Sequence, residues 1–312
     1  MSPKTKAWIS ALRLRTLPLA AGGIVLGSFI PETVFQPLVF VFALTTALGL
    51  QILSNLANDY GDFIKGTDND KRIGPVRALQ SGLIQKEEMK NALRICAALT
   101  FFSGVVLIAV SFGADQWISA AGMLVVGLLA IWAAIRYTIG KKPYGYAGLG
   151  DVFVVAFFGI VSVCGVAFLH SGFLDKNVWY PALSYGFLAA GVLNINNMRD
   201  IDNDREAGKR TLVVQLGANG ARLYHGTLIG FAFILQAVYL HEINPACFFG
   251  LPKYGRYLAL VGFIPVFINS VRVLQPKAHA SEYNPFLKGL SLGAFFEVLV
   301  FIMALMILPI FV

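Results

Sequence analysis

Apolar runs separated by short polar connections recur along the chain. Crossing the hydrocarbon core of a bilayer takes about 20 mostly apolar residues, and nine runs approach that length. Lipid offers the backbone no hydrogen-bond partner, which favours helices over barrel strands for such spans. The pattern predicts an all-α, polytopic membrane helical bundle that forms a single domain over residues 1–312. The predicted spans are Thr16–Ile30, Pro37–Ala57, Leu93–Phe112, Trp117–Ile135, Leu149–Leu169, Trp179–Asn197, Leu223–Leu240, Tyr257–Leu274 and Gly289–Val312.

Basic residues are distributed unevenly between the two ends of these spans. Of the 25 Lys and Arg residues, 22 lie in the N-terminal segment or in the connections that follow even-numbered spans, whereas Lys176, Lys253 and Arg256 lie on the other side. Connections rich in Lys and Arg stay in the cytoplasm. We therefore predict an integral cell-membrane protein whose N-terminus and basic connections are cytoplasmic. Residues 1–15 are interpreted as a cytoplasmic tail, because no small-residue cleavage site followed by a soluble domain appears.

Composition narrows the class of protein further. Hydrophobic residues make up 57% of the chain and charged residues 13%, and the mean hydropathy is +0.68, which excludes a water-soluble enzyme. The net charge of +8 suits anionic lipid or a phosphorylated substrate. Nucleic acid is not expected, because the basic residues sit between apolar spans. Three Cys and four His are scattered and predict neither a disulfide framework nor a zinc site, and nothing indicates an obligate protein partner.

Acidic residues gather in two places, each directly after an apolar span. Asn58 and Asp62 follow span two, and Asp200 and Asp204 follow span six. Residues four apart share a helix face, so each pair presents its oxygen atoms together. The two clusters lie four spans apart, which predicts two similar four-helix halves with a ninth helix appended. Solvated loops in which acids and bases pair are the alternative interpretation.

Clustered carboxylate and amide oxygens suit a hard divalent cation, most naturally Mg²⁺. Mg²⁺ typically uses one or two carboxylates and takes its remaining ligands from water and phosphate. A diphosphate is therefore the expected ligand, held by charge-assisted hydrogen bonds from nearby cations. The basic residues that flank the two clusters are Lys65, Lys71, Arg72 and Arg77 after the first, and Arg199, Arg205, Lys209 and Arg210 around the second.

A third polar stretch links spans four and five on the same side. Tyr137 and Lys141 are four residues apart and share a face if the fourth helix extends that far, although Gly140 and Pro143 indicate that it ends nearby. A functional interpretation gives Lys141 a phosphate and Asp151 a polar role at the entrance to span five. The alternative is ordinary anchoring at the membrane interface.

These residues resemble the UbiA superfamily of intramembrane aromatic prenyltransferases. The family patterns Asn-x-x-x-Asp-x-x-x-Asp, Asp-x-x-x-Asp and Tyr-x-x-x-Lys match, in order, Asn58 with Asp62, Asp200 with Asp204, and Tyr137 with Lys141. The first pattern departs at its last position, where Gly66 replaces Asp and Asp68 follows. Further stretches resemble the menaquinone-forming branch, namely residues 13–18, 55–62, 65–68, 144–151, 157–159, 193–200 and 208–212.

The resemblance implies Mg²⁺-dependent transfer of a polyprenyl group from polyprenyl diphosphate to 1,4-dihydroxy-2-naphthoate. Diphosphate and CO₂ would leave, and demethylmenaquinone would form. Together with the spacing it predicts the following roles: Asn58, Asp62, Asp200 and Asp204 as metal ligands with Asp59 and Asp68 as auxiliaries, Arg72, Arg77, Lys141 and Lys209 on the diphosphate, and Tyr137 and Asp151 positioning the acceptor or assisting proton movement.

Two other functions remain open from the sequence. Another aromatic acceptor, such as 4-hydroxybenzoate, would keep the same chemistry. A membrane transporter would also show internal repeats and intramembrane polar groups. It is disfavoured because the acidic clusters lie at the ends of spans rather than at their middles.

Overall fold

A computed structural model describes residues 1–30, 33–67, 77–243 and 255–307 of the chain. Within these ranges the protein is almost entirely helical and has no strand. Nine helical segments of the described chain are long and apolar enough to cross a membrane. The predicted all-α membrane bundle is therefore confirmed, whereas the single domain and the two similar halves stay predictions.

The helices alternate in direction and follow the predicted spans closely. Their bounds are α1 Pro3–Leu12, α2 Leu17–Phe29, α3 Pro37–Ile64, α4 Lys86–Ser111, α5 Trp117–Arg136, α6 Gly150–Val154, α7 Val166–Ser171, α8 Trp179–Arg199, α9 Ile201–Glu206, α10 Leu212–Glu242, α11 Ile264–Leu274 and α12 Asn284–Ile307. Between α6 and α7 the chain forms a π-helix, Val155–Gly165, and a 3₁₀ helix, Gly255–Phe263, leads into α11.

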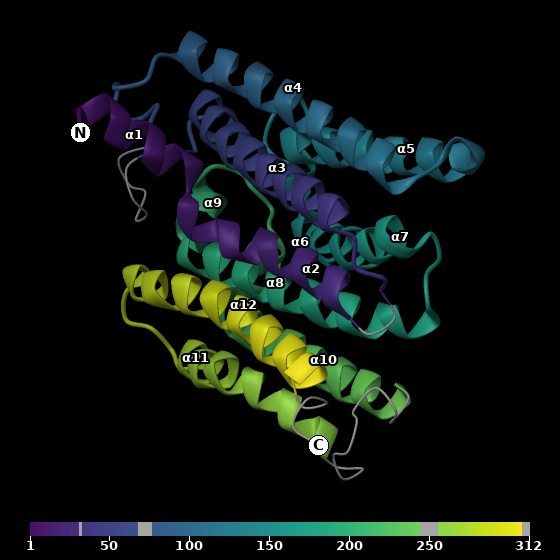
Figure 1. Cartoon of the computed structure of the whole chain (residues 1–312). Helices are drawn as coiled ribbons and strands as arrows, with labels where there is room; N and C mark the ends of the chain where they lie inside the picture. Colours follow the sequence, from purple (N-terminus) through teal and green to yellow (C-terminus); the bar gives the residue numbers. More distant parts are fainter. Residues whose placement is uncertain (31–32, 68–76, 244–254, 308–312) are drawn as a thin grey trace.

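Helix α8 is the centre of the bundle. In its most apolar stretch 72% of the residues are buried, compared with 11% in α4 and in α5. The main apolar core surrounds α8 with residues of α2, α10 and α12. Figure 1 shows α4 and α5 along one side of the molecule and α10, α11 and α12 along the other. The polar side chains at the end of α8 are therefore attached to the most buried of the spans.

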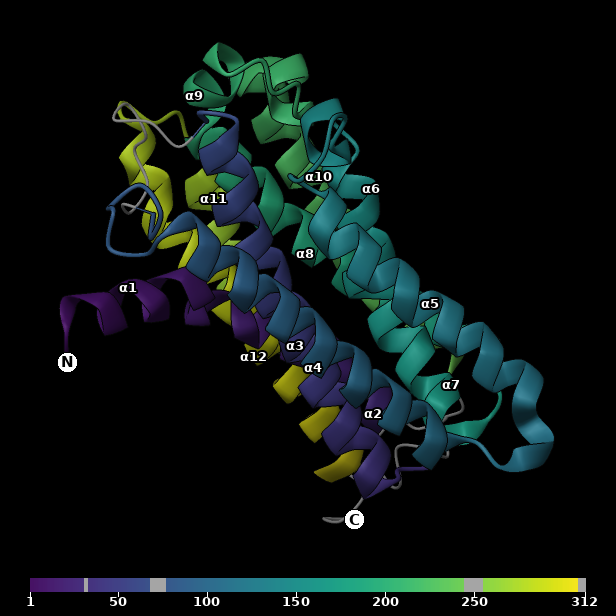
Figure 2. The ribbon, with the colours of Figure 1, turned by 90° about the horizontal axis from the view of Figure 1, so that it is seen from above.

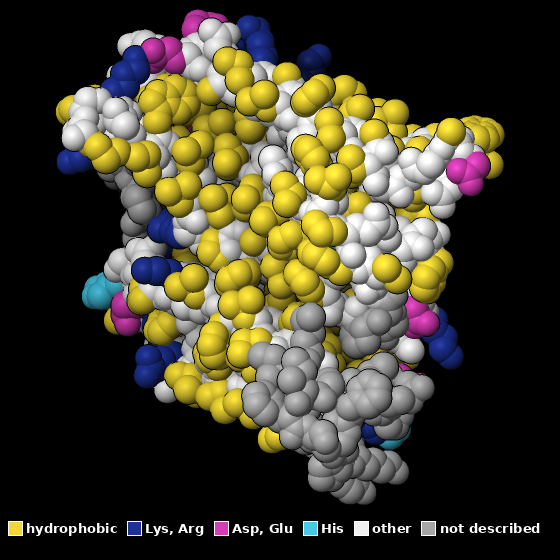
Figure 3. Space-filling view, in the orientation of Figure 1, with side chains coloured by type: hydrophobic (Ala, Val, Ile, Leu, Met, Phe, Trp, Pro, Cys, Tyr) yellow, Lys and Arg dark blue, Asp and Glu magenta, His cyan; other side chains and the backbone are white. Residues whose placement is uncertain are grey.

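The outer surface of α4 and α5 is apolar. Leu99 and Phe102 expose 66% and 68% of their surface, and Trp117 and Ile118 are similarly exposed. Figure 3 shows hydrophobic side chains over most of one face, with Lys and Arg mainly at the end where α1 and α9 lie. Exposing a patch of this size to water would be unfavourable, so this face contacts lipid.

The N-terminal segment, which we predicted to be a cytoplasmic tail, forms helix α1. Ser2 caps the helix by accepting a hydrogen bond from the Thr5 amide at 3.1 Å, and Pro3 stands in the first turn. Ala7 and Ala11 then bury against Leu56 and Met89. This Ser-Pro start is a recognisable N-cap signal. Figure 2 shows α1 pointing away from the axis of the bundle.

Two other helices begin before the predicted spans. Helix α4 begins at Lys86 because Gln85 and Glu88 form a capping box. Helix α10 begins at Leu212 and is kinked at Gly217, which has φ +69°. Charged and amphipathic turns extend these helices beyond the bilayer core, and hydropathy alone detects only the apolar part.

The π-helix packs closely against α8 through glycine. A Cβ atom added to Gly159 would lie 2.5 Å from the Ala182 carbonyl oxygen and 2.9 Å from the Gly186 Cα. Both obstacles are backbone atoms, which cannot rotate away. Gly159 therefore sets the distance between these two segments.

We expect Gly159→Ala to lower the free energy of unfolding by about 1–3 kcal/mol, the usual cost of overpacking. The measurement is the apparent Tm in detergent. The matched control is Gly122→Ala on α5, where an added Cβ meets nothing within 4 Å and removal of a helical glycine is neutral or mildly stabilising. Equal losses in the two variants would contradict this account of the contact.

Candidate functional site

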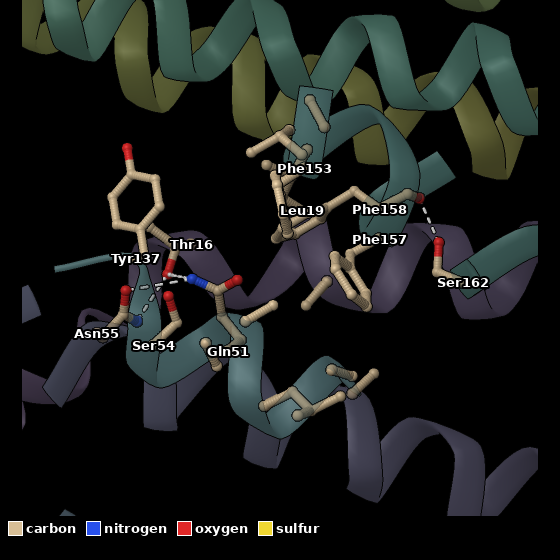
Figure 4. A pocket seen from close by; sticks show the side chains of 18 of the residues that line it. Thr16, Leu19, Gln51, Ser54, Asn55, Tyr137, Phe153, Phe157, Phe158 and Ser162 are labelled. Atoms are coloured by element: carbon tan, nitrogen blue, oxygen red, sulfur yellow. Dashed lines mark hydrogen bonds between the residues drawn. The ribbon is translucent and has the colours of Figure 1, made fainter. Parts of the chain in front are cut away.

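A cavity of about 380 Å³ lies among α2, α3, α4, α5, the π-helix and α8. At the end near α9 its wall is charged, and further along it is lined by aliphatic and aromatic side chains. Figure 4 shows part of this interior, with the polar side chains of Thr16, Gln51, Ser54 and Asn55 close together and Phe153 and Phe157 further along the cavity. The cavity therefore suits a long amphipathic ligand with a charged head.

The structure brings most of the predicted site residues to this cavity, but not all. Those lining it are Asn58, Asp62, Arg77, Tyr137, Asp200, Asp204 and Lys209. Asp59, Lys141 and Asp151 do not line it. Asp68 and Arg72 lie outside the described residues.

The acidic end of α3 is fixed by a tyrosine that the sequence analysis did not assign. The Tyr146 hydroxyl donates to Asp62 Oδ1 at 2.8 Å. Since that hydroxyl has only one proton, the Thr67 hydroxyl donates to Tyr146, at 2.6 Å. Tyr146 also accepts the Arg210 amide at its carbonyl, at 3.0 Å. The loop between α5 and α6 thus joins α3 to the segment after α9.

The second acidic group lies where α8 passes into α9. Arg199, which is 1% exposed, donates to both carboxylate oxygens of Asp200, at 2.8 and 2.5 Å. The same guanidinium reaches Asn196 at 2.9 Å and Asn284 at 3.3 Å. This fork holds Asp200 at the cavity. Arg199 therefore positions a carboxylate rather than facing the ligand.

Lys209 neutralises the carboxylates of both helix ends. Gly208 has φ +70° and closes α9, and the Lys209 amide donates back to the Asp204 carbonyl at 2.8 Å. Its ammonium lies 3.5 Å from Asp204 Oδ1. Burial by itself would lower the pKa of Lys209, but the charges of Asp62 and Asp204 raise it above its ordinary value. Lys209 is therefore a fixed cation within the cavity wall.

Two groups at this end have pKa values raised mainly by burial. Burial raises the pKa of Asp204 to about 6, while Lys209 acts in the opposite direction. Burial likewise raises the pKa of Tyr137 to about 12. Tyr137 therefore remains an uncharged hydrogen-bonding group at neutral pH. The charges of the site are carried by the carboxylates and Lys209.

Asp59, which we predicted to be an auxiliary metal ligand, binds two arginines. It is 1% exposed and binds Arg13 at 2.5 Å and Arg77 at 3.3 Å. Arg13 has φ +48°, a left-handed conformation unusual for a residue with a side chain, and both arginines line the cavity. Asp59 thus holds two cations of the cavity wall through its Oδ1 atom.

Lys141 is separated from Tyr137 because α5 ends at Arg136. Gly140 then adopts φ +114° and reverses the chain. Lys141 is exposed and lines a smaller pocket with Tyr60, Lys65 and Thr138. The condition for the two residues to share a helix face is therefore not met. Tyr137 reaches the cavity because Gly61 lets the chain pass: a Cβ there would lie 2.7 Å from Thr138.

Asp151 is buried at the start of α6 but faces away from the cavity. The Tyr224 hydroxyl donates to its Oδ1 at 3.3 Å, and Asp151 is 6% exposed. It therefore ties α6 to α10. Gly150, Phe153 and Val154, its neighbours on the same helix, line the cavity.

The donor set of the site fits a hard cation. Asn58 Oδ1, Asn203 Oδ1 and Asp204 Oδ2 are buried without a hydrogen-bond partner, and unpaired buried oxygens are unfavourable unless a ligand satisfies them. No three His, Cys, Asp or Glu side chains of the described chain cluster tightly enough to hold an ion by themselves. Oxygen ligands divided between two helix ends suit Mg²⁺ that is completed by phosphate and water.

Comparison with known proteins decides the family. The model of the UbiA prenyltransferase family matches residues 16–296. The chain belongs to the UbiA prenyltransferase family. As a UbiA prenyltransferase it is an integral, multi-pass membrane enzyme, and the resemblance inferred from its motifs is confirmed.

Two UbiA relatives are similar over most of their length. The chain is 42% identical to a 1,4-dihydroxy-2-naphthoate octaprenyltransferase of Escherichia coli strain K12, over 97% of this chain and 96% of the relative. It is 45% identical to the enzyme of the same name from Haemophilus influenzae, over 74% and 76% of the two chains. A solved UbiA homologue from Archaeoglobus fulgidus bound to DMAPP and Mg²⁺ shares the fold, with a TM-score of 0.61, 16% identity and coverage of 96% and 99%.

We expect Asp59→Ala to destabilise the fold by about 2 kcal/mol, because two arginines lose the carboxylate between them. Breaking a fully buried pair costs about 3–5 kcal/mol, and Arg13 and Arg77 keep some exposure. The apparent Tm in detergent measures the effect.

The control for this variant is Asp202→Ala. Asp202 pairs with Arg205 at 3.1 Å, but both side chains are more than half exposed, so the loss stays below about 1 kcal/mol. A Tm for Asp59→Ala no lower than that of the control would show that the Arg13–Asp59–Arg77 cluster is not a structural element.

Proposed function

We propose that this UbiA prenyltransferase transfers a polyprenyl group from its diphosphate to 1,4-dihydroxy-2-naphthoate, releasing diphosphate and CO₂. The proposal rests on one observation: two acidic helix ends and a buried lysine meet at the mouth of an apolar cavity. The acceptor is taken from the relatives, which carry that substrate in their names at 42% and 45% identity. The product is demethylmenaquinone in its hydroquinone form.

This transfer is balanced in electrons and requires no further reagent. The carbon–oxygen bond of the allylic diphosphate breaks with both electrons leaving on diphosphate. A carbon–carbon bond to the ring then forms, and the electron pair of the ring–carboxylate bond returns to the ring as CO₂ departs. No external oxidant or reductant is consumed, so the ring stays at the hydroquinone level.

We propose Mg²⁺ as the resident ion of this site. Asn58, Asp62, Asp200 and Asp204 would hold it, and the unpaired oxygens of Asn58 and Asp204 support this set. The A. fulgidus homologue of the same fold was solved with Mg²⁺ and DMAPP. When bound, the ion neutralises the leaving diphosphate and acts as a Lewis acid that favours carbon–oxygen cleavage.

The chain's own cations serve the diphosphate. Lys209 and Arg77 line the same cavity as the carboxylates and would donate to outer phosphate oxygens. Further from them the wall becomes apolar, with Leu107, Ile108 and Leu128 among its members. Such a wall accommodates the prenyl chain and limits access of water to the reactive allylic carbon.

We place the site on the cytoplasmic side. The helix ends that carry it are α3, α8 and α9, and the ends of α5 and α11 and the starts of α4 and α12 lie on the same side (Figure 1). Of the 25 Lys and Arg residues, 22 belong to the segments at this side. Loops rich in these residues remain cytoplasmic.

The direct assay uses detergent-solubilised full-length protein with Mg²⁺, a long polyprenyl diphosphate and one of two acceptors. We expect 1,4-dihydroxy-2-naphthoate to give a decarboxylated prenyl-naphthoquinone after air oxidation, detected by mass spectrometry and lost on chelation with EDTA. Product from 4-hydroxybenzoate alone would keep the family chemistry and overturn the acceptor. No product from either acceptor in folded protein would overturn the proposal.

Variants of the two acidic helix ends test the site. We expect Asp62→Ala and Asp200→Ala to lower kcat at least a hundredfold in protein that still inserts into the membrane, because each removes a ligand of the ion that stabilises the leaving group. The Tm of Asp200→Ala falls as well, since the buried Arg199 loses its carboxylate. Near-normal turnover in either variant would contradict the metal assignment.

Two lysines of the chain form a matched pair for the diphosphate assignment. We expect Lys209→Met to lower kcat/KM for polyprenyl diphosphate at least tenfold, since it removes a cation from the cavity. Lys141→Met removes an exposed lysine outside the cavity and should change kcat/KM less than twofold. A larger loss in Lys141→Met than in Lys209→Met would reverse the assignment.

A further inference from the structure

Four polar side chains form a patch inside the cavity, away from the acidic helix ends. Thr16 comes from the start of α2, and Gln51, Ser54 and Asn55 come from consecutive turns of α3; all four line the cavity. Figure 4 shows them together on one wall. Gln51 lies seven residues before Asn58, which is about 10 Å along a helix. The roles proposed above for the carboxylates and Lys209 do not involve these four residues.

The hydrogen bonds of the patch fix the orientation of the Gln51 amide. Thr16 donates its hydroxyl proton to the Arg13 carbonyl at 2.9 Å, so its oxygen can only accept from Gln51. The Asn55 amide nitrogen donates to the Leu12 carbonyl at 3.0 Å, which leaves Asn55 Oδ1 as an acceptor. Gln51 therefore presents its NH₂ group to both, at 3.1 and 3.2 Å.

The consequence is that the carbonyl oxygen of Gln51 is directed into the cavity. A reversed amide would place an acceptor against two acceptors. Leu19 and Leu50 line the cavity near this patch, so apolar groups flank the Gln51 amide. In such surroundings a single fixed acceptor selects strongly for a ligand that carries a donor.

The opposite wall is aromatic. Tyr144 and Phe153 stack with ring centroids 3.9 Å apart, and Phe153 and Phe157 follow at 6.2 Å. Figure 4 shows Phe153 and Phe157 across the cavity from Gln51. A row of rings facing a polar patch accommodates a flat aromatic molecule that has hydroxyl groups on one edge.

We propose that Gln51 is a specificity-determining residue whose carbonyl oxygen accepts a hydrogen bond from a ring hydroxyl of the aromatic acceptor. The inference rests on the proposed function, because it supplies the binding site for that acceptor. The two helical turns between Gln51 and Asn58 separate the ring from the diphosphate, and the allylic carbon lies between them. A prenyl chain has no donor, so an acceptor at this position serves the aromatic partner.

The experiment compares wild-type protein with Gln51→Met, which keeps the length of the side chain and removes the carbonyl. We expect the KM for 1,4-dihydroxy-2-naphthoate to rise about tenfold, the factor that corresponds to 1.4 kcal/mol, while the KM for polyprenyl diphosphate is unchanged. Thr45→Val is the control on the same helix, since Thr45 is exposed and bonds only its own turn.

A second measurement distinguishes recognition from a loosened helix. The inhibition constants of 1-hydroxy-2-naphthoate and 4-hydroxy-2-naphthoate are each compared with that of 2-naphthoate. We expect wild type to prefer at least one hydroxylated compound and Gln51→Met to lose that preference. Gln51→Asn keeps the amide but withdraws it by one methylene, and should give an intermediate result if Gln51→Met does not fold.

The outcomes of this experiment are distinct. A preference for the hydroxylated compounds that persists in Gln51→Met overturns the inference, as does a rise in the KM for polyprenyl diphosphate in place of the KM for the acceptor. Wild-type protein that prenylates no naphthoate overturns the proposed function instead. Loss of the preference together with an unchanged prenyl diphosphate KM supports both.

Discussion

The buried ammonium of Lys209 is the interaction on which the rest of the site depends. Asp62 at the end of α3 and Asp204 on α9 approach each other in a poorly solvated cavity, where like charges repel strongly. The Lys209 ammonium lies 3.5 Å from Asp204 and also interacts with the charge of Asp62. The Tyr146 hydroxyl donates a hydrogen bond to Asp62. The two acidic helix ends can therefore face one cavity before any ligand binds. A bound dication would then replace the repulsion between the carboxylates by attraction of both to the ion.

A membrane places this arrangement under a constraint that also simplifies it. Backbone groups in lipid must be satisfied within the helices, so irregular chain collects at the ends of the bundle, and most charged side chains lie at the end that carries the site. Here that end contains α9, the loop with Tyr146 and the joint at Arg13. The central helix α8 delivers Asp200 to it from the most buried part of the fold. The charged residues of the site therefore lie at the solvent-facing end of the cavity. The remaining part of the cavity is suited to apolar ligands.

Hydropathy and helical spacing predicted what depends on neighbours in the sequence. The nine spans, the pairing of Asn58 with Asp62 and that of Asp200 with Asp204 follow from local pattern, and all four side chains reach the cavity. Contacts between distant segments were not accessible in this way. Tyr146, Arg199 and Gln51 act through partners from other helices or through a folded loop, and Asp59 is occupied by arginines 46 residues before and 18 residues after it. Lys141 lies apart from Tyr137 because the chain turns at Gly140.

The shape of the cavity depends on the number of residues in the π-helix of span five. A π-turn holds one more residue than an α-turn between hydrogen-bonded groups, and here that winding extends from Val155 to Gly165. In an α-helix each residue rotates the next by about 100°. Loss of one residue from this segment would therefore rotate Phe153 and Phe157 relative to Ser162 and the rest of the span, and would exchange part of the aromatic wall for aliphatic side chains. An insertion or deletion at this point would therefore reshape the cavity without altering a single carboxylate.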